Sequence, residues 1–236
     1  FKFHHPSLEL LRNLKTISIE YVTSKSKAII IRLNNDYSII THNQLYGKWT
    51  FNKPKTLIKT NRQLRIEIAT EMIVVRLWSA TDINIFKTHK EMQHPYLSKL
   101  GPDVLDEKTS YDIIKLKLVG DNAVRRKLSS LLLDQSVIAG LGNYLRSEIL
   151  FQAKINHDKK ICNLNDSEIS KLSMSIKDIS LRAYQQKGST LDYEWIRKSF
   201  GNSDNFKRVK HMVFNREGFP CLLCGTPIKK VIVSSR

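Results

Sequence analysis

A chain of 236 residues, 41% of them hydrophobic, can bury a real core and form one large or two modest domains. Its 39 Lys and Arg against 22 Asp and Glu give a formal net charge of +17, which attracts polyanions, so nucleic acid is the expected partner. No apolar run spans a bilayer, no signal-peptide pattern begins the chain and no basic amphipathic helix stands out, so a membrane partner is not expected.

Alternating and β-branched segments near the N-terminus predict short strands joined by polar turns. A β-branched run at residues 28–33 turns at residues 34–36 into residues 37–41, which is typical of a hairpin. Residues 64–69 and 73–77 form a second candidate hairpin. Several short strands of this kind predict a β-sandwich.

The strand pattern breaks between Lys90 and Asp106, where two prolines and a glycine predict a linker between domains. Beyond it the hydrophobic period becomes helical, first at residues 111–118 and 127–133. Further on, Asn165 with Glu168 three residues later predicts a capping box at the start of a long helix. An apolar stripe indicates the buried face of that helix: Ile169, Leu172, Ile176, Ile179 and Ala183.

The stretch from Leu131 to Lys154 predicts two helices joined by a glycine-containing turn. Three apolar residues recur at the spacing of one helix face: Leu141, Leu145 and Ile149. Gly140 and Gly142 let backbone N–H groups approach a ligand, and Asn143 stands where a helix N-terminus favours an anion. On a basic chain we expect that anion to be a backbone phosphate. The alternative is a helical hairpin whose glycines only permit a turn.

Cys221 and Cys224, followed by Gly225, have the spacing of half a tetrahedral zinc site. With strand character in the surrounding tail we favour a zinc ribbon whose second half is missing, and a pair of reduced thiols is the alternative. Neither Cys162 nor any histidine has a spacing that completes the site. An odd number of unevenly spaced cysteines argues for a reducing compartment, so we expect a cytoplasmic protein.

The loop sequence HNQLYG, at residues 42–47, places a polar, an apolar and an aromatic side chain in a row: Gln44, Leu45 and Tyr46. On a loop tip that faces DNA, such a trio can fill the gap left when a base leaves the stack. The alternative is a plain β-turn with a half-buried tyrosine. Three other charged residues are, from the residues alone, ordinary solvated charges: Lys27, Glu148 and Arg236.

Several stretches together resemble the endonuclease VIII branch of the formamidopyrimidine-DNA glycosylase family. They occur in the family's order over nearly the whole chain: THNQLYGKW (41–49), HPYLSKLGPDVLD (94–106), LLLDQSVIAGLGNYLRSEIL (131–150), and FNREGFPCLLCG (214–225) with SSR (234–236). The resemblance implies a bifunctional DNA glycosylase/AP lyase of base-excision repair, which removes oxidised pyrimidines from damaged double-stranded DNA and nicks the strand by β,δ-elimination. It also implies a monomer of the bacterial cytosol or nucleoid that holds a structural Zn²⁺.

The resemblance also assigns roles to residues of this chain. Lys27 would contact phosphate and assist the lyase steps, and Glu148 would orient the catalytic groups. The void-filling trio would be Gln44, Leu45 and Tyr46; the phosphate contacts would be Gly142 and Asn143 in the helix–two-turn–helix and Arg236 in the zinc finger; and the metal ligands would be Cys221 and Cys224.

Family members begin with Pro-Glu-Gly-Pro, a helix and a strand, all before the position matched by Phe1, and a second zinc Cys pair is expected after Arg236. We therefore expect either a fragment of a longer gene product or a decayed copy, and as written a polypeptide that is unable to perform the proline-initiated step. The alternative function is that of a catalytically inactive protein that only binds DNA.

The expected fold class is α+β, in three parts. Residues 1–105 would form the N-terminal β-sandwich without its first helix and strand. Residues 106–210 would form the helical domain with the helix–two-turn–helix, and residues 211–236 a partial zinc-ribbon finger with an incomplete β-hairpin.

Overall fold

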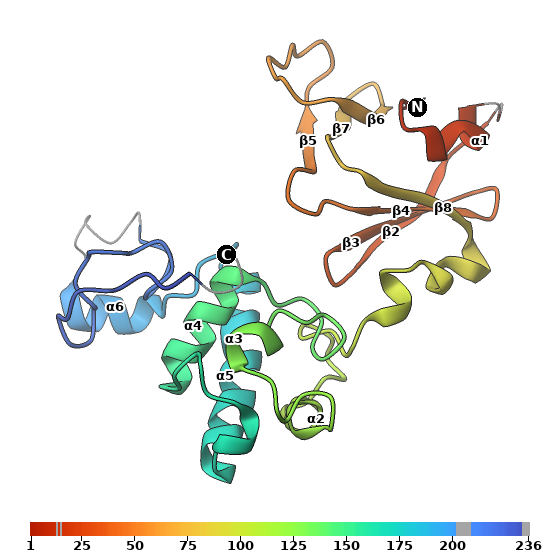
Figure 1. The fold of residues 1–236 in the computed structure, drawn as a ribbon. Coiled ribbons are helices and arrows are strands. Elements are labelled where there is room, and N and C mark those ends of the chain that lie inside the picture. The colour runs from red at the N-terminus through yellow and green to blue at the C-terminus, as the bar shows by residue number, and fades with distance from the viewer. Residues whose placement is uncertain (13, 15, 202–208, 233–236) are drawn as a thin grey trace. The chain divides into compact units, whose positions relative to one another are not determined.

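The computed structural model describes residues 1–12, 14, 16–201 and 209–232. The chain divides into two compact units, Phe1–Lys99 and Leu100–Arg236, each with its own hydrophobic core (Figure 1). The strands lie in the first unit and the longer helices in the second. The α+β class predicted from the sequence is confirmed.

The first unit contains two antiparallel sheets. Its elements are β1 (Lys2–Phe3), η1 (Pro6–Leu8), α1 (Glu9–Arg12), β2 (Ile19–Lys25), β3 (Ala28–Leu33), β4 (Tyr37–His42), β5 (Lys48–Asn52), β6 (Leu64–Ala69), β7 (Val74–Trp78) and β8 (Asp82–Lys87). One sheet has the order β1-β6-β7-β5 and the other β2-β3-β4-β8. Both sheets and α1 contribute side chains to one core, which includes Leu11, Ile31, Ile39, Ile66 and Leu77.

Both predicted hairpins are confirmed. In the first, β3 pairs with β4 so that Ile31 faces Ile39, and Asp36 takes a left-handed φ of 61° in the turn. In the second, β6 pairs with β7, with a register shift between Leu64 and Ile66. β-Branched residues favour this arrangement because their stiff side chains pack well on a pleated surface.

The segment predicted as a linker is more ordered than its prolines and glycine suggested. It forms two short 3₁₀ helices, η2 (Thr88–Gln93) and η3 (Leu97–Lys99), and the boundary between the units falls directly after η3. Glu91 holds η2 to the sheet because its carboxylate accepts hydrogen bonds from Arg32 Nε at 3.1 Å and Ser38 Oγ at 3.2 Å.

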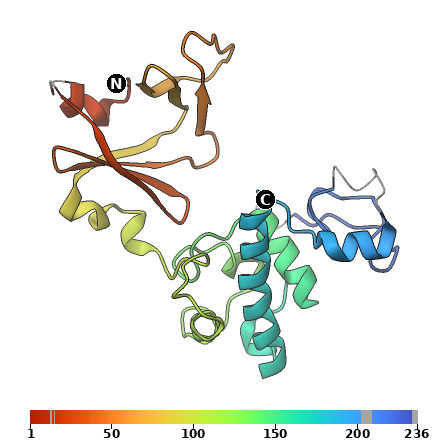
Figure 2. The same cartoon turned by 180° about the vertical axis from the view of Figure 1, so that it is seen from behind.

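The second unit is built from helices around a core of aliphatic side chains. They are α2 (Tyr111–Val119), α3 (Leu128–Leu131), α4 (Asn143–Ala153), η4 (Ile161–Asn163), α5 (Asp166–Gln185) and α6 (Tyr193–Phe200). Figure 2 shows α5 running beside α4, and Ile149 of α4 shares a core with Leu172 and Ile176 of α5. The predicted capping box at Asn165 and Glu168 is present at the start of α5.

Two predictions for this unit are met only in part, because each element is shorter than expected. The helix expected at 127–133 ends at Leu131, and beyond it the Asp134 carboxylate accepts a hydrogen bond from Ser136 N at 2.9 Å, which builds a turn instead. The tail was expected to form strands, but its described residues, 209–232, contain a single β-bridge, between Pro220 and Pro227. A β-strand is defined by a series of backbone hydrogen bonds to a neighbouring strand, and a single bridge does not form such a series.

Candidate functional site

The loop between β4 and β5 presents its predicted trio to solvent. Leu45 is 81% exposed and Tyr46 68% exposed, so the alternative of a half-buried tyrosine is wrong. Gln44 takes a left-handed φ of 49°, and its Oε1 accepts a hydrogen bond from Thr81 Oγ1 at 2.9 Å. Arg62 also donates to the carbonyl of Tyr46. The base of the loop is therefore held while its two apolar side chains stand free.

Gly47 closes this loop and has no room for a side chain. A Cβ there would lie 2.6 Å from the carbonyl oxygen of Asn43, and the Gly47 N–H donates to that same oxygen at 2.7 Å. The glycine lets the chain turn back tightly enough to lift Leu45 and Tyr46 to the tip.

Lys27 lies in the two-residue turn between β2 and β3, directly before the first residue of β3. Its neighbour Ser26 has a left-handed φ of 54°. Burial lowers the pKa of nearby His42, the Asp82 carboxylate raises it, and the charge of Lys27 lowers it again. The charge of Lys27 therefore acts on the imidazole at the end of β4.

The turn that leads into α4 is fixed by side-chain and backbone contacts. Gln135 donates from Nε2 to the carbonyls of Leu133 and Leu141, at 2.9 and 3.0 Å, and accepts from Gly140 N at 3.1 Å. Gly140 needs its left-handed φ of 101°, whereas Gly142 is extended at φ −135°. A backbone conformation that favours glycine is thus required at Gly140 and not at Gly142.

Asn143 is the first residue of α4, as the sequence predicted. Gly142 precedes it as the cap without a side chain, so no cap side chain occupies the first amides of the helix. The Asn143 Oδ1 is buried and makes no hydrogen bond to any described residue. A buried polar atom without a partner is costly, and a ligand at this helix start would supply one.

Glu148, five residues further along α4, is 1% exposed, so the alternative of a solvated helix carboxylate is wrong. Its Oε1 accepts hydrogen bonds from the backbone N–H groups of Val213 and Phe214, at 2.8 and 2.9 Å. Its Oε2 accepts from Met212 N at 2.7 Å and Thr190 Oγ1 at 2.8 Å. The carboxylate ties the tail segment to the helix that begins at Asn143.

His211 extends this hydrogen-bond chain. Thr190 Oγ1 gives its proton to Glu148, so it accepts from His211 Nδ1 at 3.0 Å, which leaves Nε2 as the unprotonated nitrogen of the neutral ring. The His211 ring also packs on Tyr144 and Phe214, at centroid distances of 5.2 and 5.6 Å. Sequence analysis missed Thr190 and His211, because nothing in their local sequence links them to a helix 42 or more residues away.

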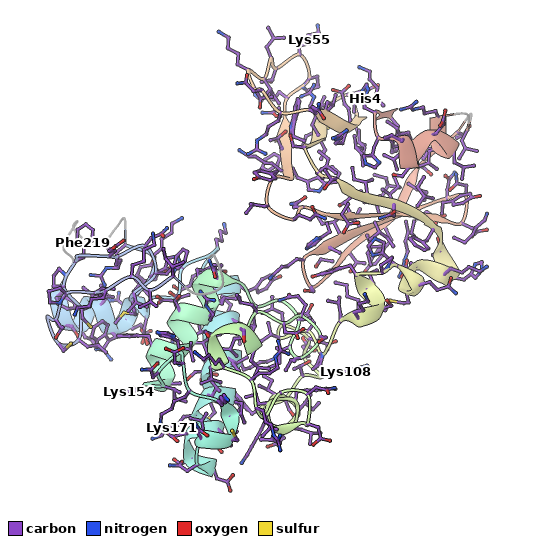
Figure 3. All side chains as sticks on the ribbon, viewed as in Figure 1. His4, Lys55, Lys108, Lys154, Lys171 and Phe219 are labelled. Atoms are coloured by element: carbon purple, nitrogen blue, oxygen red, sulfur yellow. The ribbon has the colours of Figure 1, made fainter. Side chains whose placement is uncertain are left out.

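Side chains of α4, together with the tail, line a groove of about 690 Å³. Its walls include Asn143, Ser147, Phe151 and Phe214. Four cationic residues line it, Arg146, Lys154, Lys229 and Lys230, against one carboxylate, Glu217. Figure 3 shows Lys154 projecting from the end of α4. The groove therefore suits an anionic ligand with apolar parts.

Cys221 and Cys224 lie on one tight turn. Gly225 N donates to Cys221 O at 2.9 Å, and Leu223 N donates to Cys221 Sγ at 3.4 Å. The side-chain contact with Thr226, and then its backbone, lower the pKa of the Cys224 thiol, which favours the thiolate that metals bind. Among the described residues, no group of three or more His, Cys, Asp or Glu side chains could hold a metal ion.

Two predicted features fall outside the residues that the structure describes. Arg236, the predicted phosphate contact of the finger, is one of them, and most of the loop sequence that begins at Gly201 is the other.

Comparison with known proteins covers both units. The family model of the formamidopyrimidine-DNA glycosylase H2TH domain matches residues 100–194. Endonuclease 8 of Salmonella typhi is 36% identical over 215 residues, which are 91% of this chain and 78% of that protein. Endonuclease 8 of Escherichia coli strain K12/DH10B is 34% identical over 218 residues, 92% of this chain and 80% of that protein.

Solved structures give the same fold. The formamidopyrimidine-DNA glycosylase of Lactococcus lactis, non-covalently bound to DNA that contains an AP site, superposes with a TM-score of 0.79 at 22% identity. That match covers 100% of this chain and 86% of the other. A second complex of the L. lactis enzyme, with DNA containing an abasic site, gives a TM-score of 0.80 over the same shares of the two chains.

Proposed function

Because the chain belongs to the formamidopyrimidine-DNA glycosylase family, alongside the endonuclease 8 proteins, we propose that it is a DNA glycosylase with AP lyase activity in base-excision repair. Its partner is damaged double-stranded DNA, and its substrates are oxidised pyrimidines. The QLY form of the loop at residues 44–46 favours this branch over the 8-oxoguanine enzymes.

The observation that carries this proposal is the 36% identity to an endonuclease 8 over 91% of the chain. The stretches of sequence that resemble the family include the β4–β5 loop, the start of α4 and the Cys pair, which lie in separate elements. A formal net charge of +17 supports the same partner, since phosphate contacts dominate the affinity of proteins for DNA.

Each candidate residue has a role that its surroundings support. An enzyme that acts on a base must take it out of the stack, and the exposed Leu45 and Tyr46 can fill the gap that remains, with Gln44 at their base. Lys27 carries a cation on the turn beside His42, and we assign it to a phosphate contact and the lyase steps. Cleavage of the strand would then use groups of the first unit.

The second unit would grip the backbone. Asn143, with Gly142 before it, offers a helix start to a phosphate, and Arg236 is assigned a further phosphate contact by resemblance. Glu148 acts indirectly: it holds residues 212–214 against α4 and so orients the groups around it. We assign the helix–two-turn–helix to residues 106–210 and the finger to residues 211–236.

We also propose that Cys221 and Cys224 supply two of the four ligands of a structural Zn²⁺. The tight turn and the lowered pKa of the Cys224 thiol fit this role. Zinc at such a site cross-links the chain and takes no part in the reaction.

The test is cleavage of a duplex that carries one oxidised pyrimidine, by the natural full-length protein. We expect a cut at the lesion and, with borohydride present, a covalent protein–DNA adduct that reports the Schiff base. The matched control is the same duplex with 8-oxoguanine, which we expect to be cut more slowly. An uncut pyrimidine-lesion strand and no trapped adduct would refute the proposal.

A further inference from the structure

The segment His94–Tyr96 belongs to a motif shared with the family, yet it carries none of the roles assigned above. It lies between η2 and η3, directly before the end of the first unit at Lys99. Several of its contacts reach the turn that holds Lys27. The inference below deepens the proposed function and rests on the role proposed there for Lys27.

Tyr96 holds the turn from the side. Its hydroxyl lies 3.0 Å from the hydroxyl of Ser26, the residue before Lys27. Its ring stacks on the imidazole of His42, with centroids 4.3 Å apart and planes 25° apart. Ser26 has a left-handed φ of 54°, a conformation that is unfavourable for a non-glycine residue and persists only where surrounding contacts impose it.

His94 makes a second set of contacts, which connects Tyr96 with Asp82 and His42. His94 is 1% exposed, and its Nδ1 accepts the backbone N–H of Tyr96 at 3.1 Å. The side-chain amide nitrogen of Asn84 donates to Asp82 Oδ1 at 3.0 Å and lies 3.1 Å from the other ring nitrogen of His94, Nε2. That nitrogen lies 3.5 Å from Asp82 Oδ1. The other carboxylate oxygen, Asp82 Oδ2, lies 3.8 Å from Nδ1 of His42.

These contacts form a closed path from the segment to the lysine turn. One branch runs from the Tyr96 hydroxyl to Ser26. The other runs from His94 through Asp82 to His42, whose imidazole lies within the field of Lys27. Lys25, at the end of β2, adds a contact from its Nζ to the sulfur of Met92 in η2, at 3.5 Å.

We propose that Tyr96 and His94 are positioning residues for Lys27: they clamp the β2–β3 turn and thereby set where the lysine ammonium stands. Residues 94–99, at the C-terminal end of the first unit, are thus coupled through these contacts to the lysine proposed to act in strand cleavage. A change in the path of residues 94–99 would move Lys27, and so affect the reaction without touching DNA.

The direct test measures the reactivity of the Lys27 amine in the natural full-length protein, by amine labelling and mass spectrometry. Tyr96→Phe keeps the ring and removes the bond to Ser26, and Ser26→Ala removes the same bond from the other side. We expect each to raise the labelling rate of the exposed Lys27 about fivefold, the factor for one lost hydrogen bond. The exposed Lys48 in β5 should label at an unchanged rate.

The double variant Tyr96→Phe/Ser26→Ala should give no further increase, because both changes delete one interaction. Tyr37→Phe is the matched control, since Tyr37 lies on β4 of the same sheet and contacts Lys87 with its ring. It should leave both labelling rates unchanged. His94→Gln, which keeps a donor toward Asp82, should disturb Lys27 less than His94→Ala.

Single-turnover cleavage of an AP-site duplex connects the clamp to the reaction. We expect Tyr96→Phe to lower the rate constant about fivefold, with the reaction amplitude unchanged. Loss of amplitude at constant rate would mean partial unfolding and would overturn the inference. Unchanged labelling of Lys27 in Tyr96→Phe and Ser26→Ala would also overturn it. Failure of the wild-type protein to cut any AP-site duplex would instead refute the proposed function.

Discussion

Glu148 illustrates how a single buried side chain can hold distant segments of the chain together. Its buried carboxylate accepts four hydrogen bonds, three of them from the consecutive N–H groups of residues 212–214. Three aligned amides and a hydroxyl compensate a buried negative charge that would otherwise be costly. The sequence alone left this residue as an ordinary helix carboxylate, because its partners are 42 to 66 residues away.

Replacing Glu148 by Ala should therefore destabilise the second unit. We expect a loss of about 3 kcal/mol in the free energy of unfolding, because the change leaves buried donors without an acceptor. Chemical denaturation measures it, with Glu107→Ala, an exposed glutamate of the same unit, as the control that should be nearly neutral. A loss no larger than that of the control would show that residues 212–214 do not depend on this carboxylate.

In contrast to the buried Glu148, Tyr46 has its large ring exposed to solvent at the tip of a loop. Tyr46→Ala should leave affinity for intact duplex unchanged and weaken binding to an abasic-site duplex by about 1–3 kcal/mol, the scale of a lost aromatic contact with bases. Paired binding titrations with the two duplexes measure the difference. Tyr184→Ala removes a similarly exposed tyrosine from α5 and should change neither affinity. Equal losses on both duplexes would show that the loop is only structural.

Among the elements, those encoded by local signals were predicted well. The turn at Asp36 and the β-branched residues beside it specify a hairpin over a few residues, and the capping box at Asn165 specifies the start of α5. The stripe Leu141, Leu145, Ile149 is buried as its spacing predicted, although the helix begins only at Asn143.

Elements that depend on distant partners were predicted less well. The tail has apolar, β-branched sequence, yet its described residues form one bridge, because strand propensity does not supply a neighbouring strand. Residues 90–99 carry a linker-like proline, Pro95, but the Arg32–Glu91 ion pair at 2.5 Å and the buried His94 fix them to the sheet. Within the candidate site, the loop, the lysine turn and the helix start were visible in the sequence, and the clusters around Glu148 and Asp82 were not.

The Cys turn gives an element-scale prediction. The natural full-length protein should bind about one zinc per chain. Cys221→Ser and Cys224→Ser should each lose the metal, whereas Cys162→Ser, which removes an exposed cysteine outside the turn, should retain it. Metal analysis of the three purified variants decides this. Zinc retained in the double variant Cys221→Ser/Cys224→Ser would exclude these residues as ligands.

For the whole molecule, the buried His94 and three half-buried histidines determine how stability depends on pH near neutrality. Burial is the main cause that lowers the pKa of His5, His42, His94 and His211 below the ordinary value of 6.5. The unfolded chain therefore takes up more protons than the folded one as the pH falls below 6.5, so their contribution to stability is complete above 6.5 and is lost below it. Hydrogen bonds from Lys2 and Arg32 lower the pKa values of Glu67 and Glu91, and that second contribution is lost only below their ordinary value of 4.5.

We thus expect the melting temperature to fall as the pH is lowered from about 7 to about 5.5, before the carboxylates begin to titrate. Calorimetry across this range tests it. His94→Gln should flatten the dependence, and His4→Gln, which changes an exposed histidine (Figure 3), should not. A melting temperature that is constant or rises toward pH 5.5 would contradict the assignment of these histidines as neutral in the folded protein.

Charge is the other property of the whole chain that bears on function. The formal net charge of +17 favours binding to any polyanion, so selectivity has to come from particular residues. Among the described helices, none is long and apolar enough to cross a membrane. With the net positive charge and the role proposed for the loop at residues 44–46, we expect affinity for all DNA to depend strongly on salt, and damaged DNA to be bound more tightly than intact DNA.

The most direct measurement is therefore the affinity of the natural full-length protein for two duplexes, one intact and one with a central abasic-site analogue, over a series of salt concentrations. We predict that both affinities fall with a slope of about −0.9 for each phosphate neutralised, and that the damaged duplex binds at least about tenfold more tightly throughout. Equal affinity for the two duplexes, or no binding even in dilute buffer, would contradict the account.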